Sequence, residues 1–416
     1  MKVNRISVSF STLVISISLF AQTAGQKKIL FDCTHSETAG NGDWCIDADA
    51  QNLGWGSSGA YTGGSKSNPQ RYPNPAQTTV TSSTAETYWE GALSYWAIDL
   101  VNKGFWVETL PYTGQITYGS STNAQDLSNY NVFIVDEPNI RFTQAEITAI
   151  MHFISNGGSL FAISDHQGSD RNNDGWDSPM IWNDFMTNNP VQNNAFGHTF
   201  LYENFSGVSS NILVSATDSV LHGPMGNVTE VQWSNGTCMV INPSQNSSVK
   251  AHIWKNGYGQ TDTAAICVTA QYGCGKIASI GDSSPPDDGT GNPSVSLYTG
   301  YTGDAAGHHR PWLVNIVLWL ANAGCSGTTG VSSIKESNAF SVYPNPMVNE
   351  LNIKLPFIAQ KATVSLVDVL GKEVVSSDIN IGSEVSLKED NLTAGVYFVK
   401  VVADGKTLQT VKVIKQ

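Results

Sequence analysis

Residues 130–166 read YNVFIVDEPNIRFTQAEITAIMHFISNGGSLFAISDH, and this stretch decides the fold. An apolar run at 131–136 and another at 159–164 are typical of strands that are buried on both faces. Between them, apolar residues recur at three- and four-residue spacing after a Thr cap and before two glycines, which predicts a helix. Because strands that are joined through a helix usually pair in parallel, the stretch predicts an α/β fold with a parallel sheet.

The same alternation continues on both sides of this stretch. The patterns predict further strands at 27–32, 105–111 and 275–285, and helices at 85–104 and 310–324. The region 200–270 is richer in β-branched residues and turns, which predicts additional antiparallel strands. We therefore expect one large α/β domain over residues 27–324, with a parallel sheet flanked by helices.

The N-terminal residues have the composition of a secretory signal peptide. Lys2 and Arg5 precede an apolar stretch from Ile6 to Phe20, and small residues follow it. The apolar stretch is too short to cross a bilayer. We therefore expect residues 1–21 to be a signal peptide, and we predict no membrane span.

The charge balance limits the classes of partner. The formal net charge is −13, and 14% of the residues are charged. An acidic chain without a basic stripe repels nucleic acid unless metal ions intervene, so nucleic-acid binding is not favoured. This composition suits an extracellular protein whose partners are neutral or cationic.

The chain has six cysteines, an even number in a protein that we predict to be exported: Cys33, Cys45, Cys238, Cys267, Cys274 and Cys325. Disulfides are therefore expected, although many pairings are possible. The pairs closest in sequence, Cys33 with Cys45 and Cys267 with Cys274, are the first to test. A cysteine zinc site is not expected, because no Cys-x-x-Cys spacing occurs.

The composition changes after Gly324. Residues 325–339 are mostly small and polar, which predicts a linker. Residues 340–416 alternate apolar and polar positions between turn signals. That pattern predicts a small antiparallel β-sandwich.

Several segments of this C-terminal region resemble the C-terminal sorting domain of the type IX secretion system of Bacteroidetes. They are Tyr343–Pro346 (YPNP), Leu351–Ile353 (LNI), Asp368–Lys372 (DVLGK), Leu392–Phe398 (LTAGVYF) and Val411–Lys415 (VKVIK). The resemblance implies that the type IX secretion machinery exports the chain across the outer membrane. The domain at 27–324 would then be attached to the cell surface or free in the medium. The resemblance implies nothing about activity.

The large domain is similar to the class I glutamine amidotransferase-like superfold, which has a flavodoxin-like sheet. The similarity rests on YNVFIVDEPN, FTQAEITAIMHFISNGGSLFAISDH, GKIASIGDSS and WLVNIVLWLA, in this order. It looks closest to the ThuA-like and intraflagellar-transport-like (GIFT) branches. An amidotransferase has a nucleophilic cysteine after its third strand, where this chain has Asp136 and Glu137, so glutaminase activity is not expected. The segments ETAGNGDW and SDH…DRN…WD also resemble secreted bacterial proteins that are described only as hydrolases.

Polar residues follow four of the predicted strands, at the edge where open parallel sheets place their ligands. Asp165 and His166 follow one strand, and a carboxylate beside an imidazole is suited to a general base or a metal site. A structural hydrogen-bonded pair is the alternative. Further candidates at this edge are Asp32, His35 and Asp282 as partners, and Asp136 with Glu137 as a metal-free acid–base pair.

The spacing of Asp170, Asn172 and Asp174 matches the first half of a calcium-binding loop, in which oxygens at alternate positions converge on the ion. Asp177 is expected to supply a further oxygen. The closing Glu of an EF-hand is missing, because Ile181 stands at its position. We expect calcium binding here. A catalytic role for part of the loop and a solvated turn are the alternatives.

Three residues are candidates for substrate binding: Trp176, Arg171 and His308. An aromatic face in a polar segment, as at Trp176, can stack on a sugar ring, although such rings are equally suited to a core. His198, His222 and His252 favour structural roles. GxSxG, HExxH and P-loop patterns do not occur in the sequence.

Together these features predict a secreted hydrolase that acts on an extracellular biopolymer, with a polysaccharide or glycan favoured. Calcium is the expected cofactor, a second divalent metal is an open alternative, and no nucleotide cofactor is expected. One alternative is a calcium-dependent glycan-binding protein without catalytic activity. The other is a metal-dependent nuclease or phosphoesterase.

Overall fold

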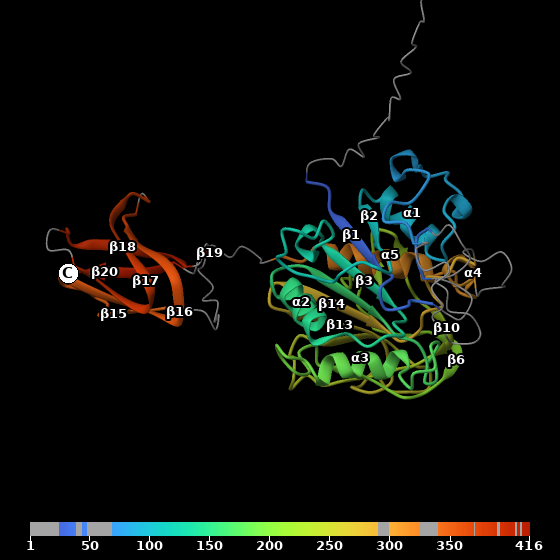
Figure 1. Cartoon of the computed structure of the whole chain (residues 1–416). Coiled ribbons are helices and arrows are strands. Elements are labelled where there is room, and N and C mark those ends of the chain that lie inside the picture. Colours follow the sequence, from blue (N-terminus) through green and yellow to red (C-terminus); the bar gives the residue numbers. More distant parts are fainter. Residues whose placement is uncertain are drawn as a thin grey trace, which may run out of the picture. The chain divides into compact units, whose positions relative to one another are not determined.

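The computed structural model divides into two compact units, residues 1–326 and 327–416, which we describe separately (Figure 1). The structure describes residues 25–38, 44–47, 69–289, 299–324, 340–369, 371–388, 392–403, 406–407 and 410–416. The predicted signal peptide and the predicted linker lie outside these residues.

The centre of the larger unit is a ten-stranded mixed sheet. Five neighbouring strands are parallel: β2 (Trp106–Leu110), β1 (Lys28–Asp32), β3 (Val132–Asp136), β4 (Ser159–Ile163) and β14 (Gly275–Ile280). Antiparallel strands continue the sheet through β13 (Ala265–Tyr272), β11 (Met239–Ile241) and β5 (His198–Phe200), with β12 (Lys250–Trp254) and β7 (Asn211–Ile212) alongside. The sheet is therefore mixed, with the predicted parallel strands in one part and antiparallel strands, predicted for region 200–270, in the other.

Helices cover both faces of the parallel strands. α1 (Ser94–Asn102) and α5 (His309–Ala321) pack in one hydrophobic core, and α2 (Gln144–Ser155) and α3 (Ser178–Thr187) pack in another. Successive residues of β1 alternate between these cores, because side chains along a strand point to opposite faces. Burial on both faces explains why the parallel strands are continuous apolar runs.

The predicted helix between the two glycines and the Thr cap is confirmed. The Thr143 hydroxyl accepts a hydrogen bond from the Glu146 amide, and the Glu146 carboxylate accepts one from the Thr143 amide. This capping box begins α2, and Gly157 follows its end with a φ of 101°.

The predicted helix at 85–104 is only partly correct, because α1 begins at Ser94. Upstream of it the chain forms the short 3-10 helix η3 (Glu86–Tyr88). Gly91 then packs directly on the backbone of the 44–47 loop, where its amide donates to the carbonyl of Ile46. A helix cannot make this close backbone contact, so tertiary packing overrides the local periodicity.

The remaining elements of the larger unit are short. They are the strand pair β6 (Phe205–Ser209) and β10 (Val231–Gly236), the pair β8 (His222–Gly223) and β9 (Gly226–Asn227), the helix α4 (Gly300–Gly303), and the 3-10 helices η2 (Gln77–Thr79) and η4 (Leu127–Asn129). Within the part of the chain that the structure describes, no helix has both the length and the apolar character needed to cross a membrane.

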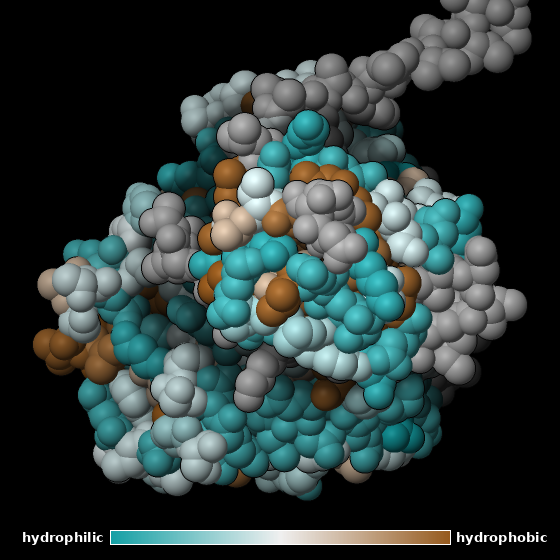
Figure 2. All heavy atoms as spheres, turned by 90° about the vertical axis from the view of Figure 1, so that its left-hand side faces the viewer, coloured by the Kyte–Doolittle hydropathy of each residue, from teal (hydrophilic) through white to brown (hydrophobic). Residues whose placement is uncertain are grey.

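The smaller unit is an antiparallel β-sandwich with its own core of residues such as Leu351, Val364 and Val413. Its strands are β15 (Ser341–Tyr343), β16 (Glu350–Val367), β17 (Glu373–Lys388), β18 (Gly395–Ala403), β19 (Lys406–Thr407) and β20 (Val411–Lys415). This agrees with the alternating pattern of the sequence. In the view of Figure 2, most of the visible surface is hydrophilic, and hydrophobic residues form small patches.

Both predicted local disulfides are wrong. Cys33, Cys45 and Cys267 are buried thiols, and Cys238 is a fourth. Cys274 is disulfide-bonded, and its bond is not to Cys267. Proximity in sequence therefore did not identify the disulfide in this fold, because strand and loop geometry decides which sulfur atoms meet.

Candidate active site

The carboxyl ends of the parallel strands place acidic side chains along one edge of the sheet. Asp32 and Asp136 end β1 and β3, and Asp165 and Asp282 each lie two residues beyond β4 and β14. All four side chains are buried. We use the name carboxyl cluster for five of the acids at this edge, Asp136, Glu137, Asp165, Asp282 and Asp287.

Glu137 lies at the centre of the carboxyl cluster and is completely buried. Its Oε1 accepts from Arg171 Nε at 2.8 Å, and its Oε2 accepts from Trp44 Nε1 at 2.8 Å and from Ser283 Oγ at 2.7 Å. Three donors, one of them a guanidinium, stabilise a buried negative charge. The backbone of Glu137 has a φ of 49°, which is uncommon outside glycine and costs about 1–3 kcal/mol.

Asp165 shares the guanidinium of Arg171, whose Nη2 donates to Asp165 Oδ2 at 3.0 Å. Burial raises the pKa of Asp165 well above its usual value, and the charges of Glu137 and Asp282 raise it further, against the effect of Arg171. One guanidinium therefore contacts both acids, and the pKa of one of them, Asp165, is raised.

His166 is half-buried beside this pair. Its Nδ1 lies 3.0 Å from Asp165 Oδ2, which is an ion-pair distance, but without the angles of a hydrogen bond. Burial lowers the pKa of His166, so the imidazole is neutral at pH 7. A neutral ring can accept or donate a proton.

Asp136 is the most isolated acid of the carboxyl cluster. Neither of its buried oxygens has a hydrogen-bond partner among the described residues. Burial raises the pKa of Asp136 well above its usual value, and Glu137, Asp282 and Asp287 add to this effect. Burial also raises the pKa of Asp282 to about 7 and that of Asp287 to about 8. The edge therefore holds several carboxyl groups whose pKa values burial raises.

A second set of residues surrounds the imidazole of His35, and we name Asp32, His35, Glu37 and Glu146 the His35 cluster. His35 Nδ1 lies 2.8 Å from Asp32 Oδ2, and its Nε2 lies 3.6 Å from Glu146 Oε2. Burial opposes the charged imidazolium, but Asp32 and Glu146 outweigh it and raise the pKa of His35 to about 9. Burial raises the pKa of Glu37 as well.

Part of the His35 cluster has the geometry of a metal site. Asp32, His35 and Glu37 each offer one ligand atom, and these atoms lie within 4.8 Å of one another. In the described part of the chain this is the one such group of three His, Cys, Asp or Glu residues. Carboxylate and imidazole ligands suit a divalent cation, which would compete with the proton of the His35 imidazole.

Asn139 connects the two clusters. The backbone amide of Asn139 donates to the carbonyl of His35 at 2.8 Å. The side-chain Oδ1 of Asn139 accepts from the backbone amide of Arg171 at 2.9 Å. Its Nδ2 donates to the carbonyl of Ser36 at 2.9 Å. Asn139 therefore bridges the backbone segments that carry His35 and Arg171.

The predicted calcium loop folds through hydrogen bonds between its side chains and its own backbone. Asp170 accepts from the amides of Asp174 and Gly175 at 3.1 and 2.8 Å, and Asp174 accepts from Trp176 at 2.9 Å. Asn172 Nδ2 donates to the Asn139 carbonyl at 2.6 Å, which ties the loop to the site. Calcium binding to this loop stays a prediction.

Asp177 caps a helix. One of its oxygens accepts from the Met180 amide at 3.0 Å at the beginning of α3, and the other accepts from Gly168 at 2.8 Å. An aspartate at this position satisfies a helix amide that would otherwise lack a partner. Asp177 therefore has a structural role whether or not the loop binds an ion.

The candidates for substrate binding lie in different environments. Trp176 is half-buried beneath the guanidinium of Arg141, which lies 3.9 Å from the ring centre. Arg171 belongs to the carboxyl cluster through its two ion pairs. His308 lies apart, where its Nδ1 accepts from the amides of Thr229 and Glu230 at 3.1 and 3.3 Å.

Several residues of the site were not singled out in the sequence. Trp44 and Ser283 each donate to Glu137. Ser283 directly follows the candidate Asp282, and Trp44 ends the segment ETAGNGDW. Their positions beside these segments were a weak indication that they belong to the site. In the sequence, the capping box fully accounts for Glu146, so its second role beside His35 was not predicted.

A family model described as a secretion-system C-terminal sorting domain matches residues 341–416. The chain therefore carries a type IX secretion sorting domain, which supports export to the cell surface or the extracellular medium and the secretion machinery as a partner. No curated protein sequence matches this chain.

Among solved structures, the "mmIFT52 N-terminal domain" is 10% identical over 70% of this chain and 97% of its own, with a TM-score of 0.40. A DUF3244-family protein of Bacteroides vulgatus with an immunoglobulin-like β-sandwich fold is 18% identical over 18% of this chain and 84% of its own, with a TM-score of 0.17. Dimeric latent PorU of Porphyromonas gingivalis is 17% identical over 18% of this chain and 9% of its own, with a TM-score of 0.16. Likenesses at these TM-scores say nothing about activity.

Proposed function

We propose that this chain is a secreted hydrolase that cleaves glycosidic bonds in an extracellular polysaccharide or glycan, and that its active site is the carboxyl cluster. The observation that carries the proposal is the link Glu137–Arg171–Asp165, in which one guanidinium holds a carboxylate beside a carboxyl group with a raised pKa. Two carboxyl groups in contrasting environments are the requirement for acid–base cleavage of a glycosidic bond.

In this proposal Asp165 is the general acid. Its proton passes to the glycosidic oxygen as the bond to the sugar carbon breaks, and the charge of Glu137 stabilises the positive character that develops on the sugar ring. Arg171 positions both groups. A water molecule completes hydrolysis, and the proton that it releases restores Asp165.

His166 and Arg171 indicate the side from which substrate approaches. Their side chains are 16% and 27% exposed, whereas those of Glu137 and Asp165 are almost completely buried. A glycan would first contact the two partly exposed side chains, and Trp176 on the adjoining loop offers an aromatic face for a sugar ring. Calcium at Asp170, Asn172 and Asp174 would hold this loop in place.

A metal-assisted hydrolase is the second candidate, and the three convergent ligand atoms of Asp32, His35 and Glu37 favour it. A bound cation would activate water without using the proton of Asp165. We also propose that the parallel half of the sheet is flavodoxin-like, as in class I glutamine amidotransferase-like domains. Its strand order β2-β1-β3-β4-β14, with helices on both faces, supports this assignment.

The test is release of reducing sugar ends from a panel of polysaccharides by the purified full chain and its variants. Asp165→Asn and Glu137→Gln should each lower turnover by at least about 10²-fold, a typical contribution of a general acid or base. Asp262→Asn changes an exposed acid that is not part of the carboxyl cluster and is the matched control. Glycan binding with no turnover of any substrate would instead support the non-catalytic alternative.

A further inference from the structure

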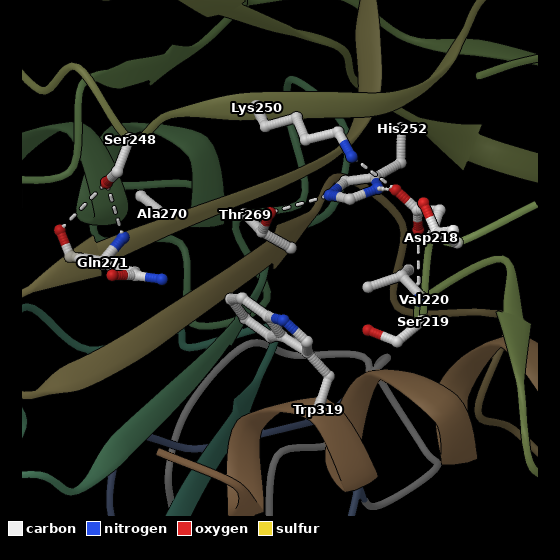
Figure 3. Close-up of a pocket in the computed structure, with 11 residues that line it drawn as sticks. Asp218, Ser219, Val220, Ser248, Lys250, His252, Thr269, Ala270, Gln271 and Trp319 are labelled. Atoms are coloured by element: carbon white, nitrogen blue, oxygen red, sulfur yellow. Dashed lines mark hydrogen bonds and ion pairs between the residues drawn. The ribbon is translucent and has the colours of Figure 1, made fainter. Parts of the chain in front are cut away.

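A polar pocket lies on the α5 side of the sheet and shares no residue with the carboxyl cluster (Figure 3). Its volume is about 270 Å³. Lys250 and His252 of β12 and Thr269 of β13 line it together with Trp319 of α5 and the segment 217–220. In Figure 3, Trp319 lies on one side of the pocket, and Lys250 and His252 lie on the other.

Three side chains in this pocket form a continuous hydrogen-bonded line. Asp218 Oδ2 lies 2.9 Å from His252 Nδ1, and His252 Nε2 lies 2.7 Å from Thr269 Oγ1. The line joins residues from three different segments of the chain. It therefore arises from the tertiary fold and not from a local turn.

The charge of Asp218 fixes the direction of these hydrogen bonds. Burial works against ionisation, but hydrogen bonds from His252 and Lys250 outweigh it and hold the pKa of Asp218 well below its usual range. Burial lowers the pKa of His252, so its ring is neutral at pH 7. Because a carboxylate only accepts, Nδ1 carries the ring proton, and Nε2 accepts the proton of the Thr269 hydroxyl.

We propose that this pocket is a second catalytic site, in which the Asp218–His252 pair activates the hydroxyl of Thr269 to cleave a short-chain acyl ester of a sugar or a similar small polyol. An oriented base beside a hydroxyl is the arrangement that makes this hydroxyl a nucleophile. The inference does not depend on glycosidic cleavage at the carboxyl cluster, because the two sites share no residue.

The reaction balances with the ester and water as its only reactants. Thr269 Oγ forms a bond to the ester carbonyl carbon while its proton moves to His252 Nε2. The bond from this carbon to the alcohol oxygen then breaks, and the alcohol takes the proton. Water next attacks the acyl-threonine, which releases the carboxylic acid and restores the hydroxyl.

The lining of the pocket suits this class of substrate. Lys250 uses one hydrogen in its 2.6 Å bond to Asp218, and its side chain is 47% exposed, so two further donors can face the charge on a carbonyl oxygen. The ring of Trp319 offers a stacking face, and Ser219 and Gln271 offer polar contacts to hydroxyl groups. The volume is at the lower end for ligand pockets, which favours a small ester over a polymer.

The experiment uses p-nitrophenyl acetate as the probe and the full chain as the protein. We expect release of nitrophenol and, after acid quenching, one acetyl group on the peptide that contains Thr269, detected by mass spectrometry. Thr269→Val keeps the shape of the side chain without the hydroxyl and should remove the label. Thr269→Ser should keep it, and His252→Gln should slow labelling by about 10²-fold or more.

Two further results decide the interpretation. Asp262→Asn should label like the wild type, because Asp262 is exposed and belongs neither to this pocket nor to the carboxyl cluster. Equal melting temperatures of wild type and Thr269→Val would show that loss of label does not reflect misfolding. An acetyl group on Lys250 alone, or labelling that Thr269→Val does not change, would overturn the proposal.

Discussion

Arg171 donates a hydrogen bond from Nε to Oε1 of Glu137 over 2.8 Å. The acceptor is completely buried at the end of a parallel strand, and the guanidinium also reaches Asp165. A buried carboxylate without a cation is strongly unfavourable. The pairing with Arg171 offsets this cost and allows Glu137 to lie beside the other acids of the sheet edge.

Removal of this guanidinium should therefore destabilise the fold. We expect Arg171→Met to lower the free energy of unfolding by about 3–5 kcal/mol, because the negative charge of Glu137 would lose its buried partner. Urea denaturation followed by tryptophan fluorescence measures the loss. Arg141→Met is the control, because Arg141 pairs with Asp184 but is 46% exposed, and its loss should be about 1 kcal/mol. Equal losses would contradict the role of Arg171.

The carboxyl cluster should also make stability depend on pH. Folding raises the pKa of Asp282 to about 7 and that of Asp287 to about 8, whereas both are about 4 in an unfolded chain. A carboxyl group whose pKa is raised in the folded state stabilises the fold fully at low pH. This contribution is lost as the pH rises through the pKa values of the folded state. We therefore expect the melting temperature to fall between pH 7 and pH 9.

Asp287→Asn is the matched variant for this prediction. An amide does not ionise, and its oxygen can still accept from the Gly289 amide as Asp287 Oδ1 does. The fall in melting temperature between pH 7 and pH 9 should be smaller in the variant than in the wild type. His35, with a folded pKa of about 9, also titrates in this window, but it does so in both proteins, so the difference between their slopes reports Asp287. Identical slopes for the two proteins would refute the assignment.

The local elements could be predicted from the sequence, but most of the site's partners could not. The strand–helix–strand unit at 130–166 is readable because burial, periodicity and the Thr143–Glu146 capping box all act within a few residues. Two of the three donors to Glu137 are Trp44 and Ser283, which are 93 and 146 positions away. Only the packed fold brings such residues together, so no local sequence pattern predicts these contacts.

The incorrect boundary of the first helix has the same cause. The apolar spacing at 85–104 is helical throughout, but Gly91 is held against the 44–47 loop. The Asp218–His252–Thr269 line is a further example. Its three residues have unremarkable neighbours in sequence, and strand pairing of β12 with β13 aligns two of them.

Added cations should distinguish the two predicted metal sites. If Asp32, His35 and Glu37 bind Mn²⁺, the ion will raise the melting temperature by about 2–4 °C for each kcal/mol of binding free energy. Asp32→Asn should remove this shift. A shift with Ca²⁺ should instead disappear in Asp170→Asn/Asp174→Asn, which leaves the His35 cluster intact. Chelation with EDTA should reverse both shifts, and no shift with either ion would refute both sites.

Gly91 links the packing of the fold to the candidate active site. A Cβ atom at this position would overlap the carbonyl oxygen of Cys45, and the Gly91 amide already bonds to the carbonyl of Ile46. Gly91→Ala must therefore push the 44–47 loop away from its position. Trp44 on this loop donates to Glu137 Oε2 at 2.8 Å, so the displacement would weaken the support of the central carboxylate.

We expect Gly91→Ala to lower the free energy of unfolding by about 1–3 kcal/mol, the usual cost of an overpacked core. It should also lower hydrolytic turnover at temperatures where the variant is still folded. Gly259→Ala is the control, because its added Cβ would make only an ordinary contact of 3.5 Å with Thr261 on the surface. Trp44→Phe separates the two effects, because it removes the donor to Glu137 without moving the loop. If Trp44→Phe keeps full turnover while Gly91→Ala loses it, the loop acts on the site by another route than the indole hydrogen bond.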